Sequence, residues 1–178
     1  MKELEVNKNH LLQYAMYAGI YLGMFWILKY AVVVFGPSGG TMGALNALLS
    51  AGTPLLLYYY LKKYHESLSG LDLSYWHGVR FSVLLFLFAS VFEALIVFLH
   101  VKWIDPAYIA RFYDTMVESA KSIQIAEPVV ARIQEQPLPG AFTYVFNNVI
   151  MGNVLMGFLL SLAIVPMVIH RKTVKSIN

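Results

Sequence analysis

Cysteine is absent from this sequence, and charged residues are scarce. Without cysteine the chain can form no disulfide, no thiolate metal site and no cysteine nucleophile. Charged residues make up 13% of the chain, whereas a soluble domain carries roughly 25%. This low charge argues against an ordinary water-soluble domain.

Common enzyme motifs are also missing. The chain has no H-E-x-x-H, no phosphate-binding P-loop and no G-x-G-x-x-G. No aspartate lies in a long apolar run, so the paired aspartates of an intramembrane protease are excluded. The five histidines are scattered along the chain near the ends of these runs, which does not favour a metal cluster. We therefore expect a protein that is not an enzyme and that has no metal or cofactor.

Long apolar runs dominate what is present. Four of them, at residues 11–35, 41–61, 78–101 and 143–169, are each about 20 residues or longer. A helix of about 20 apolar residues spans the hydrocarbon layer of a bilayer. The sequence predicts an all-α, integral membrane bundle of four transmembrane helices, which forms one domain over residues 1–178.

The loop between the third and fourth spans, residues 102–142, is the one sizeable segment outside the predicted membrane. Asp105-Pro106 predicts a helix start, with Asp as the N-cap and Pro at the first helical position. Ile109, Phe112 and Met116 then recur at helical spacing, which predicts an amphipathic helix from about Pro106 to Ser122. Glu127-Pro128 predicts a second short helix. This helical layer either caps the bundle or lies on the membrane surface.

The distribution of Lys and Arg predicts the orientation of the spans, because cytoplasmic loops carry an excess of these residues. One side, formed by both termini, the second loop and the start of the third span, holds eight of the thirteen, the loop at 102–142 holds four, and Lys29 lies within the first span. Both termini are therefore predicted to be cytoplasmic, and the loop at 102–142 extracytoplasmic.

Glu93 lies inside the third run, where a charge costs at least about 2.5–3.5 kcal/mol and calls for a partner. Lys29 is the opposite charge at similar depth. We predict an intramembrane polar cluster with these members: Glu93, Lys29, Asn46, Asn148 and Asn153. Three interpretations stay open. The cluster is a structural ion pair, or it is a protonatable or ion-binding site of a small transporter. Alternatively, Lys29 reaches the surface while Glu93 is protonated or contacts a partner protein or lipid.

Small and polar residues form stripes that predict the inward faces of the spans, since small residues let membrane helices approach closely. On the second span, Ser50 and Thr53 belong to one of these stripes and are predicted to face inward. Ordinary bundle packing accounts for these stripes, and they do not by themselves identify a transport path. The predicted helix-packing glycines are Gly19, Gly23, Gly43, Gly152 and Gly157.

Several segments together resemble a known family. YAMYAGIYLGMFW opens the first span with a G-x-x-x-G-like pattern, and GLDLS precedes the third span. Asp105-Pro106 follows that span, and Gly152 and Gly157 precede a basic terminus. Over nearly its whole length the chain resembles the small bacterial membrane proteins grouped as domain of unknown function 4199. The resemblance implies a four-helix inner-membrane protein of Gram-negative bacteria with no assigned activity, and it implies no catalytic residue.

We therefore expect a non-enzymatic protein of the bacterial inner membrane. The favoured role is an accessory or scaffold subunit that packs against other membrane proteins or against itself. The alternative is a small oligomeric transporter or channel that uses the cluster of Glu93 and Lys29. The expected partners are the lipid bilayer and either a membrane protein or a second copy of the chain, with no nucleic acid.

Overall fold

The computed structural model describes residues 2–35, 40–68, 73–124 and 127–175. The side chains of residues 2–8, 33, 35, 40–43, 46 and 171–175 lie outside this description. Nearly all described residues are helical, so the all-α class is confirmed. The elements, in chain order, are α1 (Lys2–Phe35), α2 (Gly40–Ser67), α3 (Tyr75–Leu99), η1 (His100–Ile104), α4 (Tyr108–Ser122), α5 (Glu127–Glu135), α6 (Ala141–Tyr144), η2 (Val145–Met151) and α7 (Gly152–Lys175).

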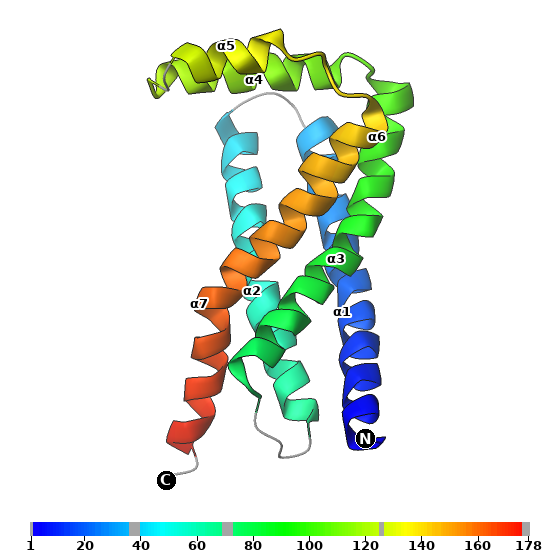
Figure 1. Ribbon diagram of the computed structural model, residues 1–178, viewed down its shortest axis with the longest axis vertical. Helices are drawn as coiled ribbons and strands as arrows, with labels where there is room; N and C mark the ends of the chain where they lie inside the picture. Colours follow the sequence, from blue (N-terminus) through cyan, green and yellow to red (C-terminus); the bar gives the residue numbers. More distant parts are fainter. Residues whose placement is uncertain (1, 36–39, 69–72, 125–126, 176–178) are drawn as a thin grey trace.

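The helices form a lengthwise bundle with a layer across one end (Figure 1). α1, α2, α3 and the continuous α6–η2–α7 helix run along the long axis, while α4 and α5 lie crosswise. We call the end covered by α4 and α5 the capped end. The opposite end, where α1 begins and α7 finishes, is the terminal end.

Within the described residues, three helical stretches are long and apolar enough to cross a membrane: Asn9–Val32, Tyr75–Ile104 and Ala141–His170. They match the first, third and fourth predicted spans. α2 is also long, but it contains Pro54 and its last turns carry Lys62, Lys63 and Glu66. The count of four spans therefore stays a prediction.

α3 is the central helix and packs against α1 on one side and α7 on another. The main core surrounds its terminal half, where Tyr64, Phe81 and Phe86 are fully buried. A second core at the capped end joins α3, η1, α4, α6 and η2, with Val97, Ile109 and Tyr144 at its centre. Burying an aromatic or aliphatic side chain of this size contributes roughly 1.5–3 kcal/mol.

The predicted amphipathic helix is present as α4, but it begins two residues later than expected. Asp105 is not its N-cap, because the N-cap position is taken by Ala107, which makes no side-chain cap bond. Asp105 instead ends η1, with its N–H donating to His100 O at 2.8 Å. The Asp105 carboxylate instead accepts a hydrogen bond from Arg111. The predicted second short helix is confirmed as α5.

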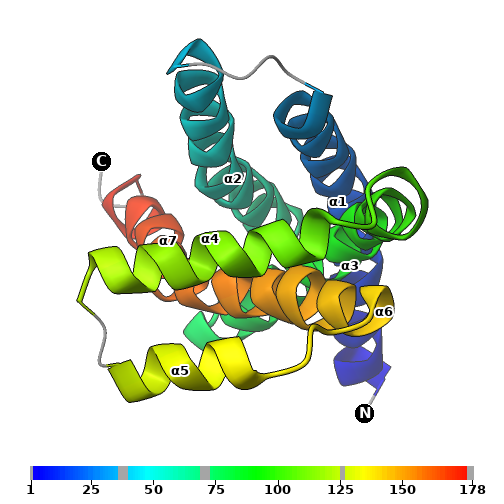
Figure 2. The same ribbon diagram turned by 90° about the horizontal axis from the view of Figure 1, so that it is seen from above.

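The first half of α4 packs on the bundle, whereas its second half packs on α5 instead. In the first half of α4, Ile109 is buried against the bundle and Phe112 contacts Tyr144. In the second half, Val117 and Ala120 pack on Val130 of α5 in a small cluster of their own. From above, α4 and α5 run on either side of the helix that leads from α6 into α7 (Figure 2), and in Figure 1 their far end reaches sideways past the top of α2. The hairpin formed by the second half of α4 and α5 therefore projects past the part that α4 caps.

α2 diverges from the bundle toward the capped end (Figures 1 and 2). Thr53 is buried and its hydroxyl accepts a hydrogen bond from Trp26 Nε1 at 3.2 Å. One turn closer to the capped end, Ser50 is exposed. The expectation that Ser50 faces inward is thus wrong, because the helix leaves its neighbours between these two residues.

Two π-helical segments, η1 and η2, interrupt the third and fourth spans near the capped end. A π-helix hydrogen-bonds i to i+5 and occurs mostly as short segments, often at functional sites. The extra residue in each turn changes the face on which later side chains lie. Sequence periodicity did not predict either segment.

Candidate functional site

Glu93 lies in the last third of α3, and Arg80, near the start of the helix, is the other Asp, Glu, Lys or Arg residue of this element. Its side chain is half-buried, and its Oε2 accepts a hydrogen bond from Asn153 Nδ2 of α7 at 2.6 Å. Polar side chains that bond across two membrane helices hold the helices together, typically for about 0.6 kcal/mol and at most about 1.7 kcal/mol. The contact therefore joins the last third of α3 to the first turn of α7.

Lys29 lies on α1 near enough to Glu93 for an electrostatic interaction. Its amino group is nevertheless not within the 4.0 Å of an ion pair with Glu93, and the three ion pairs of the described residues are elsewhere. The predicted pair of Glu93 and Lys29 is therefore not a direct contact. Glu93 is hydrogen-bonded to the amide of Asn153 instead, and the amino group of Lys29 lies farther away.

Of the other two predicted asparagines, Asn148 makes its hydrogen bond away from Glu93. Asn148 is exposed on η2, and its amide donates to Tyr144 O at 3.1 Å. An amide can satisfy itself in this way on the carbonyl four residues earlier, so it needs no cluster. Asn46 belongs to α2, but its side chain lies outside the described residues.

A second polar group lies closer to the capped end; we call it the Tyr30–His100 cluster. It takes one residue from each of four elements: Tyr30, His100, Tyr108 and Tyr144. Tyr30 Oη and His100 Nδ1 are 2.6 Å apart, and the His100 ring is 5% exposed. The ring of Tyr108 packs edge-on against His100 and also contacts Tyr144. The cluster thus ties α1 and the α3–η1 helix to α4 and α6.

Sequence reasoning missed this cluster by assigning His100 to a membrane boundary. A signal was present, because His100 follows Glu93 by seven residues and so lies on the same helix face. The two groups together place a carboxyl, an amide, a histidine and tyrosine hydroxyls along one side of α3. Such side chains can accept, donate and pass protons through hydrogen bonds.

A separate aromatic group lies near the terminal end, around Tyr64. Tyr64 Oη is 2.6 Å from His77 Nε2, and its ring stacks on Phe81 with centroids 4.4 Å apart. His10 of α1 lies over the same ring at 5.7 Å. Burial raises the pKa of Tyr64 to about 12, so the hydroxyl stays protonated at physiological pH. Within the described residues no three His, Asp or Glu gather as metal ligands.

Three of the predicted packing glycines lie at close helix contacts. A Cβ built on Gly19 would stand 2.5 Å from Phe88 Cβ, and one on Gly23 would stand 2.9 Å from Ala89 O. A Cβ on Gly157 would stand 2.5 Å from the Phe86 side chain. Gly152 is exposed, with nothing nearer than 3.9 Å. The surroundings of Gly43 lie outside the described residues.

The letters GPSGG at residues 36–40 fit the nucleophile-elbow pattern G-x-S-x-G, with Ser38 in the position of the nucleophile. That motif requires a strand before the serine and a helix after it. The residues that precede it here belong to helix α1, which ends at Phe35. The strand that the motif requires before the serine is thus replaced by a helix, which argues against a nucleophile elbow at Ser38.

Comparison with curated proteins finds no match, and comparison with solved structures finds none either. A family model does match, over residues 17–167. That range includes Glu93, Asn153, the Tyr30–His100 cluster and the packing glycines, and it covers most of the chain. The chain belongs to the family described as protein of unknown function DUF4199.

Proposed function

We propose that the protein is a non-enzymatic subunit of the bacterial inner membrane that works by packing against another membrane helix. The observation that carries the proposal is an exposed face of small residues on α2, where this helix leaves the bundle. Ala44, Ala47 and Ala51 are exposed there, and Ser50 lies beside them. In this proposal both chain termini are cytoplasmic, as the Lys and Arg count supports.

Small residues matter in a membrane because they let two helix backbones approach closely. Ala47 and Ala51 are four residues apart, the spacing of the small-xxx-small pattern. Larger side chains such as Leu48 and Leu55 are also exposed on α2, at 71% and 69%, and would flank an approaching helix. A partner helix on this face would restore packing that α2 lacks within its own chain.

Three of the five predicted packing glycines do not supply this contact. Gly19, Gly23 and Gly157 are already occupied by side chains and backbone of α3. The support for a partner therefore comes from α2 rather than from the glycine stripes.

Cysteine cross-linking tests the proposal directly, because the chain has no cysteine of its own. A second copy is the first partner to test. Ala47→Cys in native membranes should form a cross-linked dimer on mild oxidation. Ala163→Cys, which replaces an exposed alanine on α7, is the matched control and should remain a monomer.

Affinity purification in mild detergent covers a partner other than a second copy. A membrane protein should co-purify stoichiometrically with the natural chain and with Ala163→Leu. The double variant Ala47→Leu, Ala51→Leu should lose it, because leucine keeps the helix apolar but prevents close approach. Equal recovery with all three chains, together with no cross-link at Ala47, would refute the α2 face.

A small oligomeric transporter or channel is the second candidate, and Glu93 favours it. Its hydrogen-bond partner is an amide, and the nearby Lys29 makes no ion pair with it. An ionisable residue within a membrane helix is a functional candidate by default. The Tyr30–His100 cluster adds further proton-carrying groups on the same side of α3.

Proton flux into proteoliposomes, followed with an internal pH-sensitive dye, tests this candidate. If the protein conducts protons, Glu93→Gln should abolish the flux, since glutamine keeps the shape and hydrogen-bonding capacity but cannot ionise. Glu118→Gln on the exposed face of α4 is the matched control and should leave it unchanged. Flux that persists in Glu93→Gln would exclude this role for Glu93.

A further inference from the structure

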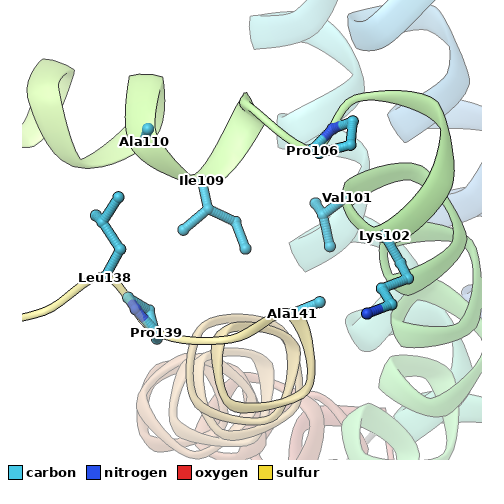
Figure 3. Close-up of a pocket in the computed structure, with 8 residues that line it drawn as sticks. All are labelled: Val101, Lys102, Pro106, Ile109, Ala110, Leu138, Pro139 and Ala141. Carbon is cyan, nitrogen blue, oxygen red and sulfur yellow. The ribbon is translucent and has the colours of Figure 1, made fainter.

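A pocket of about 280 Å³ lies where the cap joins the bundle (Figure 3). The apolar side chains of its lining come from three segments. These are Val101 of η1, Ile109 and Ala110 of α4, and Leu138 and Pro139 of the loop between α5 and α6. Lys102 is the charged residue of the lining, and it stands at the edge, with its amino group close to Ala141 in the close-up. The volume is slightly below the ~300–1,000 Å³ of sites for drug-sized ligands. It suits part of one chain-like molecule.

The pocket lies at the level where a membrane boundary is expected. It adjoins the end of the Tyr75–Ile104 stretch and the start of the Ala141–His170 stretch. Trp103, Ile104 and Phe142 beside it are exposed by 67%, 63% and 74%. Exposed aromatic side chains at the ends of spans mark the headgroup region. A pocket at the ends of two such stretches is therefore expected at the depth of lipid glycerol and phosphate groups.

Lys102 brings an uncompensated positive charge to this edge. Its side chain is exposed, and it belongs to none of the ion pairs in the described part of the chain. Asp105, three residues further on, is already engaged by Arg111. A lysine without a carboxylate partner at the membrane boundary attracts phosphate groups of anionic lipids.

We propose that this pocket binds an anionic phospholipid of the leaflet at the capped end, with the first part of one acyl chain among Val101, Ile109 and Leu138 and the phosphate on Lys102. The apolar lining selects the chain, and the lysine selects the charge. The site would fasten the α3–η1 helix, α4 and the α6 link to one lipid. It is independent of the α2 face proposed above.

Thermal unfolding of the purified full chain in a neutral detergent tests the site by lipid titration. Phosphatidylglycerol should raise Tm more than phosphatidylcholine with the same chains, and inorganic phosphate should not raise it. Lys102→Gln should weaken the apparent affinity for phosphatidylglycerol about fivefold, the equivalent of about 1 kcal/mol for one lysine at an anionic membrane surface. Lys121→Gln, an exposed lysine at the far end of α4, is the matched control and should not weaken it.

A second pair of variants tests the pocket itself. Ala110→Leu fills it from α4 and should reduce the Tm shift produced by either lipid. Ala131→Leu, on the exposed part of α5, should leave both shifts intact. The proposal fails if Lys102→Gln and Lys121→Gln behave alike, if phosphatidylcholine stabilises as well as phosphatidylglycerol, or if inorganic phosphate alone reproduces the shift. It also fails if Ala110→Leu binds lipid as the natural chain does.

Discussion

Glu93 shows how a polar residue is accommodated in a membrane helix without a direct opposite charge. Its Oε2 takes the amide hydrogen of Asn153 at 2.6 Å, while Lys29 interacts only at longer range. An amide partner gives a hydrogen bond and orientation but does not neutralise a carboxylate. The contact described here is consequently a hydrogen bond between a carboxyl and an amide, and not a closed ion pair.

A double-mutant cycle measures this contact. Glu93→Leu and Asn153→Leu should each lower stability in detergent, and the double variant should lose less than the sum, with a coupling of about 0.6–1.7 kcal/mol. Each single change removes one hydrogen-bonding partner and leaves the other alone. Thermal unfolding of the four chains gives the coupling directly.

Lys29→Leu is the comparison for the same cycle. Because Lys29 is not in contact with Glu93, its coupling to Glu93→Leu should be smaller than that of Asn153→Leu. If the stability losses of Glu93→Leu and Asn153→Leu were strictly additive, the hydrogen bond would contribute nothing to stability. If Glu93 were coupled more strongly to Lys29 than to Asn153, the result would support the ion pair instead.

At the scale of helices, the close approach of α1 to α3 depends on two glycines. Gly19 lies against Phe88 Cβ and Leu85 O, and Gly23 lies against the backbone of Ala89. Backbone atoms cannot move aside as a flexible side chain can. The approach of the two helices is therefore fixed by the absence of a Cβ.

Gly19→Ala should accordingly destabilise the protein by about 1–3 kcal/mol, as overpacking does in tight cores. Gly152→Ala should be neutral or stabilising by up to about 1 kcal/mol, because it has free space and alanine favours the helix. Thermal unfolding compares the two variants under the same conditions. Equal effects would mean that α1 and α3 are not held at the distance described.

The loss of stability caused by a substitution in α4 should depend on its position along the helix. Phe112 packs among bundle residues at the capped end, whereas Met116, one turn further, is 40% exposed. Phe112→Asp should reduce stability by more than about 1.5 kcal/mol, since it loses an aromatic contact and brings a charge toward an apolar core. Met116→Asp should cost clearly less. Folded yield and Tm of the two variants measure the difference, and a larger loss for Met116 would contradict the packing of α4.

For the whole molecule, the crosswise layer and the lengthwise helices define two different ends. One end holds α4 and α5, and the other holds the beginning of α1 and the end of α7 (Figure 1). Because the spans run from end to end, the two ends lie on opposite sides of a membrane that they cross. The orientation then decides which compartment the cap and its pocket face.

Cysteine labelling in intact cells tests the predicted orientation. Ser122→Cys in the cap should react with an impermeant thiol reagent, and Glu66→Cys near the terminal end should be protected until the membrane is opened. Both side chains are exposed, so access depends on the compartment. Labelling of Glu66→Cys alone would reverse the orientation.

Much of the architecture was determined by the sequence itself. Apolar runs as long as a bilayer is thick have few alternatives to helices, because a backbone in lipid must satisfy its own hydrogen bonds. The amphipathic spacing of Ile109, Phe112 and Met116 likewise predicted α4 from local sequence alone. The helix that begins at Glu127 was predicted from its first residues in the same manner. Glu93 was found because a single charge in an apolar run is conspicuous without any structure.

The partners of these residues were decided only by the tertiary structure. Helix depth placed Lys29, Asn148 and Asn153 near Glu93, but depth leaves the rotation of each helix open. The crossing of α3 and α7 brought Asn153 into contact, whereas the π-helical η2 carries Asn148 on the surface. Tyr30, His100, Tyr108 and Tyr144 come from four elements that are far apart in the sequence and meet where α4 packs on the bundle. Contacts of this kind depend on how helices cross and twist, and the period of a single helix does not contain that information.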